Sequence, residues 1–148
     1  MLQDFISNNV IITAFIAWAT AQILKTITHA IVYKKIDFKR LLGDGGMPSC
    51  HSAVVSSTAL SIGLIEGFNT SLFALAAVVA IVVMHDASGV RLETGKQAKI
   101  IKDMSQFIES LNNIKFDDES LKEFVGHTHL QVFIGAILGI VVALIVNL

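Results

Sequence analysis

The chain has 148 residues, of which 53% are hydrophobic and only 16% are charged. Soluble domains usually carry about 25% charged residues, so this composition argues against an ordinary soluble protein. Eleven Lys and Arg residues nearly balance twelve Asp and Glu residues, which leaves no bulk charge for binding nucleic acid. The single cysteine, Cys50, excludes an internal disulfide and a cysteine-rich metal site.

Four apolar segments follow one another along the chain, at residues 9–33, 51–68, 71–86 and 129–148. A helix crosses the hydrocarbon core of a bilayer with about 20 mainly apolar residues. We therefore expect residues 1–148 to form one all-α membrane domain, a bundle of four transmembrane helices. A soluble helical bundle is the alternative, but soluble domains seldom contain this many long apolar segments.

The positive charges predict how this bundle is oriented. Every Lys and Arg lies in the segments 34–50 and 87–128, except Lys25, which lies in the last turns of the helix leading into the first of them. Lys and Arg are retained on the cytoplasmic side of membranes. Both segments are therefore predicted cytoplasmic loops of an integral protein in a bacterial plasma membrane, with both termini outside.

The second cytoplasmic segment contains an amphipathic pattern. Its apolar residues recur at helical spacing: Ile100, Ile101, Met104, Phe107, Ile108 and Leu111. Polar and charged residues occupy the opposite face. The pattern predicts a cytoplasmic amphipathic helix, which would cover the end of the bundle or lie on the membrane surface. Packing against the bundle is the commoner role.

The sequence GGMPSCHSA, residues 45–53, leads into the second apolar segment. Pro48 suits a first helical turn, because it lacks the N–H that would be unpaired there. Ser49, Cys50 and His51 then occupy a helix start, where free N–H groups and the helix dipole favour an anion. Ser49 adds a hydroxyl donor, and His51 can exchange a proton near neutral pH. A helix cap beside an interfacial histidine explains the same residues equally well.

The sequence HDASGVRLETGK, residues 85–96, follows the third apolar segment. Asp86 lies where the helix leaves the membrane, and an ionisable residue at that depth is usually paired or functional. Arg91 and Lys96 follow on the same side and could bind phosphate oxygens. The alternative is that Arg91 and Lys96 are the positive charges that flank a membrane helix on its cytoplasmic side and that Arg91 forms a salt bridge with Asp86. This alternative explains the spacing slightly better than phosphate binding does.

The sequence GHTHLQV, residues 126–132, places His127 at the start of the fourth helix, again on the cytoplasmic side. Two histidines suit phosphoryl transfer, since one can attack phosphorus while the other protonates the leaving oxygen. Cations and backbone donors would hold the other phosphate oxygens. We expect His29 and His129 to be structural or interfacial.

A metal site is a weaker alternative for the same region. Its ligands would be His51, His85, His127 and Asp86. The sequence has no compact helical histidine pair that would support such a site. We therefore expect no metal and no cofactor.

These motifs resemble those of a known family. MPSCHS is similar to the PSGH motif of the type 2 phosphatidic acid phosphatase superfamily, with Cys50 in place of glycine. GHTHLQVFIGAILG is similar to the last motif of that superfamily. Together with DASGVR and GKQA, the motifs resemble its divergent branch, labelled acid phosphatase or vanadium-dependent haloperoxidase related.

The resemblance implies roles for the two histidines. His127 matches the nucleophile that would form a phosphohistidine, and His51 matches the general acid. Gln131 stands where the family has the aspartate that orients the nucleophile. An amide cannot stabilise an imidazolium as a carboxylate does, so Asp86 could replace that aspartate from the third helix.

The resemblance also implies which groups hold the phosphate. The backbone N–H of Cys50 and the hydroxyl of Ser49 would bind its oxygens. The Arg-Pro pair of the first motif is missing, and no arginine lies shortly before His127. Lys39 and Arg40 are the nearest candidates for the charge of the missing Arg-Pro pair. Arg91 or Lys122 would supply the charge of the missing arginine before His127.

The sequence therefore predicts a membrane phosphatase-like protein that hydrolyses a lipid or isoprenoid phosphate through a phosphohistidine, without a metal. The apolar tail of the substrate would lie between the helices. Two alternatives stay open: a non-catalytic phospholipid- or phosphate-binding membrane protein, and a small transporter or assembly subunit that uses Asp86, His85 and Lys25. Four helices form a thin bundle, which is compatible with a homodimer.

Overall fold

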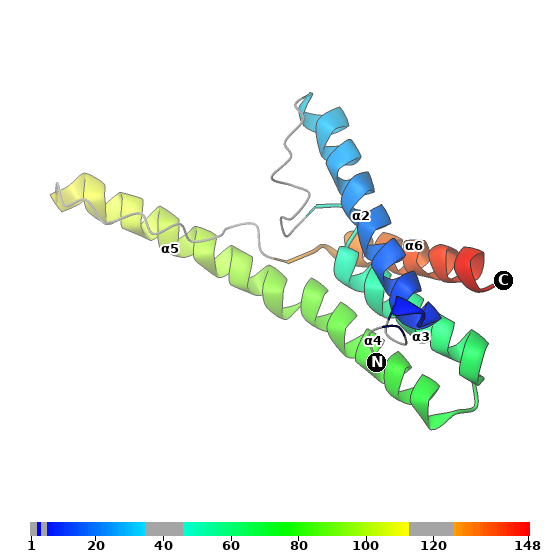
Figure 1. Cartoon of the computed structure of the whole chain (residues 1–148). Helices are drawn as coiled ribbons and strands as arrows, with labels where there is room; N and C mark the ends of the chain where they lie inside the picture. Colours follow the sequence, from blue (N-terminus) through cyan, green and yellow to red (C-terminus); the bar gives the residue numbers. More distant parts are fainter. Residues whose placement is uncertain (1–2, 4–5, 35–45, 113–125) are drawn as a thin grey trace.

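The computed structural model describes residues 3, 6–34, 46–112 and 126–148. The secondary-structure elements in this part are all helices, which confirms the predicted all-α class. They are α2 (Asn9–Tyr33), α3 (Cys50–Glu66), α4 (Ser71–Ser88), α5 (Val90–Asn112) and α6 (His129–Asn147) (Figure 1). Lys39, Arg40 and Lys122 lie outside the described residues.

Three helical stretches are long and apolar enough to cross a membrane. They are α2, α6 and the stretch Ser71–Ile108, which contains α4 and continues into α5. The fourth predicted crossing is α3, which has 17 residues. At 1.5 Å per residue this helix is about 25 Å long, slightly less than the roughly 30 Å hydrocarbon core. The crossing by α3 therefore stays a prediction.

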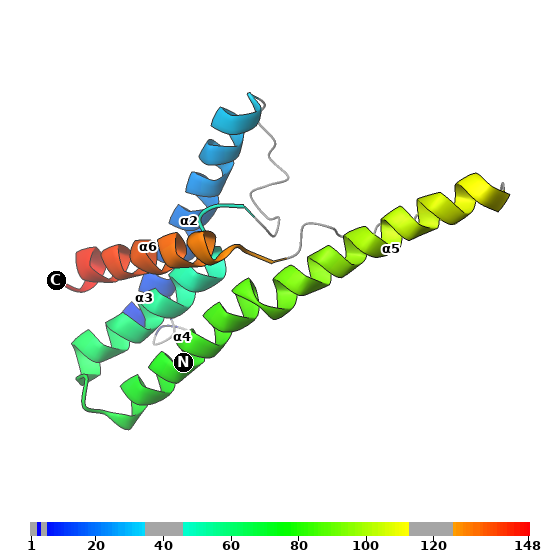
Figure 2. The ribbon, with the colours of Figure 1, turned by 180° about the vertical axis from the view of Figure 1, so that it is seen from behind.

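Helix α3 is the centre of the bundle. It packs against α2, α4 and α6, and among the described residues α2 and α4 do not contact each other. Figure 2, seen from behind, shows α3 between α4 and α6. Because α2 and α4 flank α3 without closing over it, part of the α3 surface between them is left open.

Small side chains allow α3 and α6 to approach closely. A Cβ atom added at Gly135 would collide with the carbonyl oxygen of Ser49, and one at Gly139 would collide with Ser56 Oγ. The Ser56 Oγ lies 2.6 Å from the carbonyl oxygen of Ser52 in its own helix and 3.1 Å from that of Ala136 in α6, so its one hydroxyl hydrogen is shared between them. Small residues and interhelical hydrogen bonds of this kind hold membrane helices together where the hydrophobic effect cannot.

The far end of the bundle is held by a polar cluster. Asn147 of α6 donates hydrogen bonds to Thr13 Oγ1 of α2 at 3.3 Å and to Ser61 Oγ of α3 at 3.0 Å. Polar side chains inside a bilayer must find partners within the protein. These bonds hold the three helices together at the end of the bundle away from the starts of α3 and α6.

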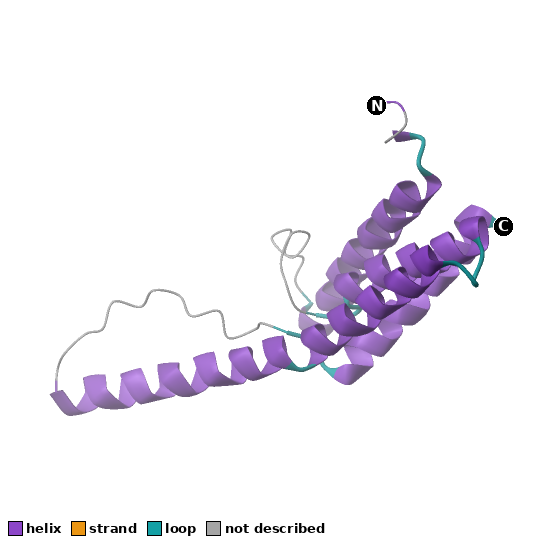
Figure 3. Ribbon diagram, turned by 90° about the horizontal axis from the view of Figure 1, so that it is seen from below, coloured by secondary structure: helices purple, strands orange, loops and turns teal. Residues whose placement is uncertain are grey.

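Helix α5 begins almost directly after α4. The break lies at Gly89, whose N–H donates a hydrogen bond to the carbonyl oxygen of His85 at 2.8 Å. The α5 helix lies within the predicted loop 87–128 and extends away from the other helices (Figures 1 and 3). Its predicted apolar residues are exposed, and its contact with a membrane surface or with the bundle stays a prediction.

Candidate functional site

The start of α3 is fixed to α6 by buried hydrogen bonds. Ser49 is fully buried, and its side chain caps the helix by accepting a bond from the Ser52 N–H. The Ser49 N–H donates to the carbonyl oxygen of Gln131 at 3.1 Å. Pro48 precedes this N-cap, whereas we expected it inside the first helical turn. The alternative that Ser49 is a helix cap is therefore correct, and a phosphate-binding role for its hydroxyl stays a prediction.

The segment before α6 is held just as tightly. The His127 N–H donates a hydrogen bond to the carbonyl oxygen of Ala87, at the end of α4, at 2.9 Å. Gly126 has a φ of 100°, and a Cβ there would collide with the Leu92 backbone. Only glycine fits this conformation and this close approach. These contacts set the position of the His127 ring relative to the bundle.

The rings of the two predicted histidines lie edge to face near the starts of α3 and α6. The ring centroids of His51 and His127 are 6.0 Å apart, with an angle of 61° between the ring planes. His127 is buried, with 2% of its surface exposed, whereas His51 is half-buried. One reactive atom placed between the rings would therefore be within reach of both side chains.

Gln131 determines which nitrogen of His127 carries the proton. Its Oε1 accepts a hydrogen bond from the Thr128 N–H at 3.1 Å, which fixes the oxygen end of the amide. The same oxygen lies 3.3 Å from His127 Nδ1. Because an amide oxygen only accepts, Nδ1 must be the donor. The contact that we expected between Gln131 and the nucleophile candidate is present.

Burial lowers the pKa of His127. The positive charges of His51 and Lys25 act in the same direction, and hydrogen bonds to Gln131 and to the Gly46 backbone oppose them. A lower pKa keeps the imidazole neutral near pH 7, which is the form that can attack phosphorus.

Lys25 lies next to these residues, a position that we did not expect from the sequence. Its side chain is 2% exposed, and its Nζ lies 3.8 Å from Cys50 Sγ. The chain around Gly46 passes close to its aliphatic stem. The signal in the sequence was a polar stripe, since Gln22, Lys25 and His29 share one face of α2 at helical spacing. A polar stripe on a membrane helix faces the protein interior.

Two of the other predicted phosphate-binding residues, Arg91 and Lys96, are exposed and form salt bridges with acidic residues. Arg91 Nε donates to Asp86 Oδ2 at 2.8 Å, and both side chains are about half exposed. The salt bridge that we considered as an alternative for these two residues is therefore present. Lys96 lies on the exposed surface of α5 and contacts Glu93 at 2.7 Å. Within the described ranges, no three His, Cys, Asp or Glu side chains gather as a metal site.

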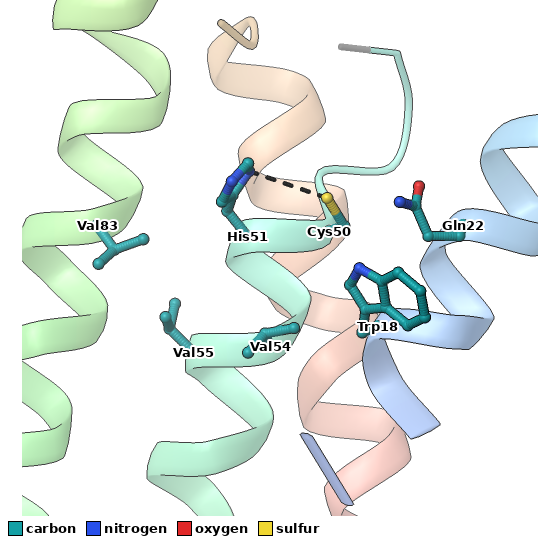
Figure 4. A pocket seen from close by; sticks show the side chains of 7 residues that line it. All are labelled: Trp18, Gln22, Cys50, His51, Val54, Val55 and Val83. Atoms are coloured by element: carbon teal, nitrogen blue, oxygen red, sulfur yellow. Dashed lines mark hydrogen bonds between the residues drawn. The ribbon is translucent and has the colours of Figure 1, made fainter. Parts of the chain in front are cut away.

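A groove opens beside His51, across the face of α3 between α2 and α4 (Figure 4). Its volume is about 370 Å³, within the range of small-molecule pockets. The groove has a polar end at Cys50 and His51 and an apolar remainder. Its walls come from all three helices and include Trp18, Gln22, Val54, Val55 and Val83.

The comparison with known families agrees with the motifs. The model of a family described as "Divergent PAP2 family" matches residues 6–142. This chain belongs to the divergent PAP2 family. The resemblance stated for the PSCH and GHTHLQV motifs is thereby confirmed at the level of the family.

One relative of this divergent PAP2 protein is named "Uncharacterized membrane protein YuiD", from Bacillus subtilis (strain 168). The two chains are 33% identical over 152 residues, which cover 97% of this chain and 96% of the relative. No solved structure matches the chain. The relative and the long apolar helices together identify this divergent PAP2 protein as an integral membrane protein.

Proposed function

We propose that this protein is a membrane phosphatase that hydrolyses a lipid or isoprenoid phosphate through a phosphohistidine, without a metal. The observation that carries the proposal is the 6.0 Å separation of the His51 and His127 rings, which come from distant parts of the sequence. A nucleophile and a proton donor placed on either side of one phosphorus atom suit a two-step displacement.

In the proposed first step, the His127 nitrogen that is not bonded to Gln131 attacks phosphorus. The bond between phosphorus and the lipid oxygen breaks, and His51 gives its proton to that oxygen. In the second step, water attacks the phosphohistidine while His51 accepts a proton from it. Inorganic phosphate leaves, and His127 is neutral again.

The groups that hold the phosphate are proposed from their positions. The side chain of Lys25 and the free N–H groups at the start of α3, including that of Cys50, would stabilise the charge on the phosphate oxygens. Ser49, Arg91, Lys96, Lys39 and Arg40 stay as predicted contributors. The apolar tail would lie in the groove over α3, which the lack of contact between α2 and α4 leaves accessible from the bilayer.

A second candidate function is the binding of a lipid phosphate without turnover. The observation that favours it is the amide of Gln131, which contacts His127 at 3.3 Å where the parent family has a carboxylate. A carboxylate would stabilise the imidazolium more strongly than the neutral amide of Gln131 does.

The test is phosphate release from a panel of lipid and isoprenoid phosphates, with the purified protein in mixed micelles containing EDTA. We expect Gln131→Asp to raise kcat by about tenfold or more, since a carboxylate beside a catalytic histidine is worth up to about 10⁴ elsewhere. Gln131→Asn is the matched control, because it shortens the side chain equally without adding charge. If neither wild type nor Gln131→Asp releases phosphate from any lipid that binds, the second candidate is correct.

We propose that the site faces the cytoplasm and that both termini face outward. A cysteine introduced by Asn69→Cys, in a Cys50→Ser background, should then react with an impermeant maleimide added outside intact cells. Asn69 is exposed in the turn between α3 and α4, at the end of the bundle away from the histidines. Labelling only after the cells are opened would show that the protein has the opposite orientation in the membrane.

A further inference from the structure

The groove over α3 is lined by a polar side chain of α2 that the proposed chemistry does not use. Gln22 of α2 lines the groove and is 6% exposed. Its Oε1 is buried and has no hydrogen-bond partner among the residues that the structure describes. Most buried polar side-chain atoms have a partner, so an unpaired amide in a groove points to a ligand group that bonds it.

The neighbours of Gln22 define what that ligand group is. Its side chain projects toward Cys50, and Trp18 lies one turn away on the same helix (Figure 4). His51 borders the groove at the same end as Cys50, while Val54 and Val55 form the apolar part. A ligand here would place its phosphoester near His51 and its hydrocarbon chain on the valines. Gln22 lies beside Cys50, at the same end of the groove as His51, so it would meet the part of the molecule next to the phosphoester.

A hydroxyl group suits this position best. It can donate a hydrogen bond to the amide oxygen and accept one from the amide nitrogen, so either orientation of the Gln22 amide is satisfied. An isoprenoid phosphate has only carbon and hydrogen next to its phosphoester and would leave the amide unpaired. A lipid built on glycerol can carry a hydroxyl on the carbon next to the one bearing the phosphate.

We propose that Gln22 makes the groove selective for a phosphorylated lipid whose alcohol carries a free hydroxyl beside the phosphoester, such as a monoacylglycerol phosphate. The inference rests on the proposed function, because it places the phosphoester between His51 and His127. It narrows the substrate class from lipid and isoprenoid phosphates to hydroxyl-bearing glycerol lipids.

The experiment compares two ligands that differ in one group: a monoacylglycerol phosphate and the propanediol phosphate analogue that lacks only the central hydroxyl. Trp18 is the single tryptophan of the chain and lines the groove, so its fluorescence reports binding without any need for turnover. We expect wild type to bind the hydroxyl-bearing lipid about tenfold more tightly, since unpaired buried polar groups discriminate strongly against an analogue that lacks the partner.

Gln22→Met removes the amide at nearly constant volume. We expect this variant to bind both ligands equally, with its affinity for the propanediol analogue no lower than that of wild type. Gln97→Met is the matched control, because Gln97 is exposed on α5 and its replacement should leave the tenfold preference intact. Phosphate release from both lipids is measured in parallel.

Equal binding of the two ligands to wild type overturns the inference, and this result does not depend on whether Gln22→Met folds. A preference that Gln22→Met leaves unchanged overturns it as well. Failure of the proposed function looks different: the preference would appear in Trp18 fluorescence while no phosphate is released. Phosphate release without a preference for the hydroxyl-bearing lipid would support the proposed function and contradict the role of Gln22.

Discussion

Replacing His127 by alanine is expected to abolish phosphate release and the covalent phosphoenzyme together. His127 would be the only side chain that forms a bond to phosphorus, so no second residue can complete the first step. Removing the nucleophile of a catalytic set lowers kcat by about 10⁶ in well-studied hydrolases. The measurement is rapid acid and alkali quenching with a radiolabelled lipid phosphate, since phosphohistidine is labile in acid and stable in alkali.

His129→Ala is the matched control for this prediction. His129 lies two residues further along and is exposed at the first position of α6. Its replacement should leave both the rate and the phosphoenzyme unchanged. If His127→Ala keeps its turnover, or if wild type hydrolyses lipid phosphate without any trapped phosphohistidine, the covalent mechanism is wrong.

The pH dependence of kcat/KM should reflect the burial of His127. Burial lowers the pKa of His127 in the free protein, and only the neutral imidazole attacks phosphorus. Lowering the pH protonates His127, so kcat/KM falls only when the pH passes below that lowered pKa. The acid limb assigned to His127 should therefore lie below the ordinary pKa of a histidine.

The helices could largely be predicted because each is a long apolar segment with a recognisable end. Helix α2 has the predicted bounds, and α3 begins one residue earlier than predicted and ends two residues earlier. The early end follows from Gly67, whose φ of 103° interrupts the helix. Helix α5 was predicted only from Ile100 onward, because residues 90–99 are mainly polar and give no periodic apolar signal.

Individual motifs could also be predicted, together with the contacts of Gln131 with His127 and of Asp86 with Arg91, but the position of Lys25 could not. His51 and His127 stand out because glycine, proline and capping residues mark the helix starts beside them. The depth of Lys25 depends on how α2 packs against the chain around Gly46, a contact between segments 21 residues apart. The polar stripe on α2 indicates that Lys25 faces the protein interior, but it does not show which segment covers the side chain.

The largest remaining effect is expected for His51→Ala on natural lipid substrates. Without the general acid, the lipid oxygen must leave as an alkoxide, which is a very poor leaving group. General acid catalysis is worth about a hundred- to ten-thousandfold, so turnover of a lipid phosphate should fall by that factor. An aryl phosphate such as nitrophenyl phosphate leaves as a stable phenolate, so its first step should be almost unaffected. His85 is an exposed histidine of α4, so His85→Ala should leave the turnover of both substrates unchanged.

The two roles proposed for His51 can then be separated in one experiment. With nitrophenyl phosphate, His51→Ala should still form the phosphohistidine at close to the wild-type rate. Hydrolysis of this phosphohistidine should be slow, because no base accepts the proton of the attacking water. Stopped-flow absorbance should therefore show a burst of one nitrophenolate per protein followed by a slow steady state. Equal losses for lipid and aryl phosphates, with no burst, would mean that His51 shapes the site without transferring a proton.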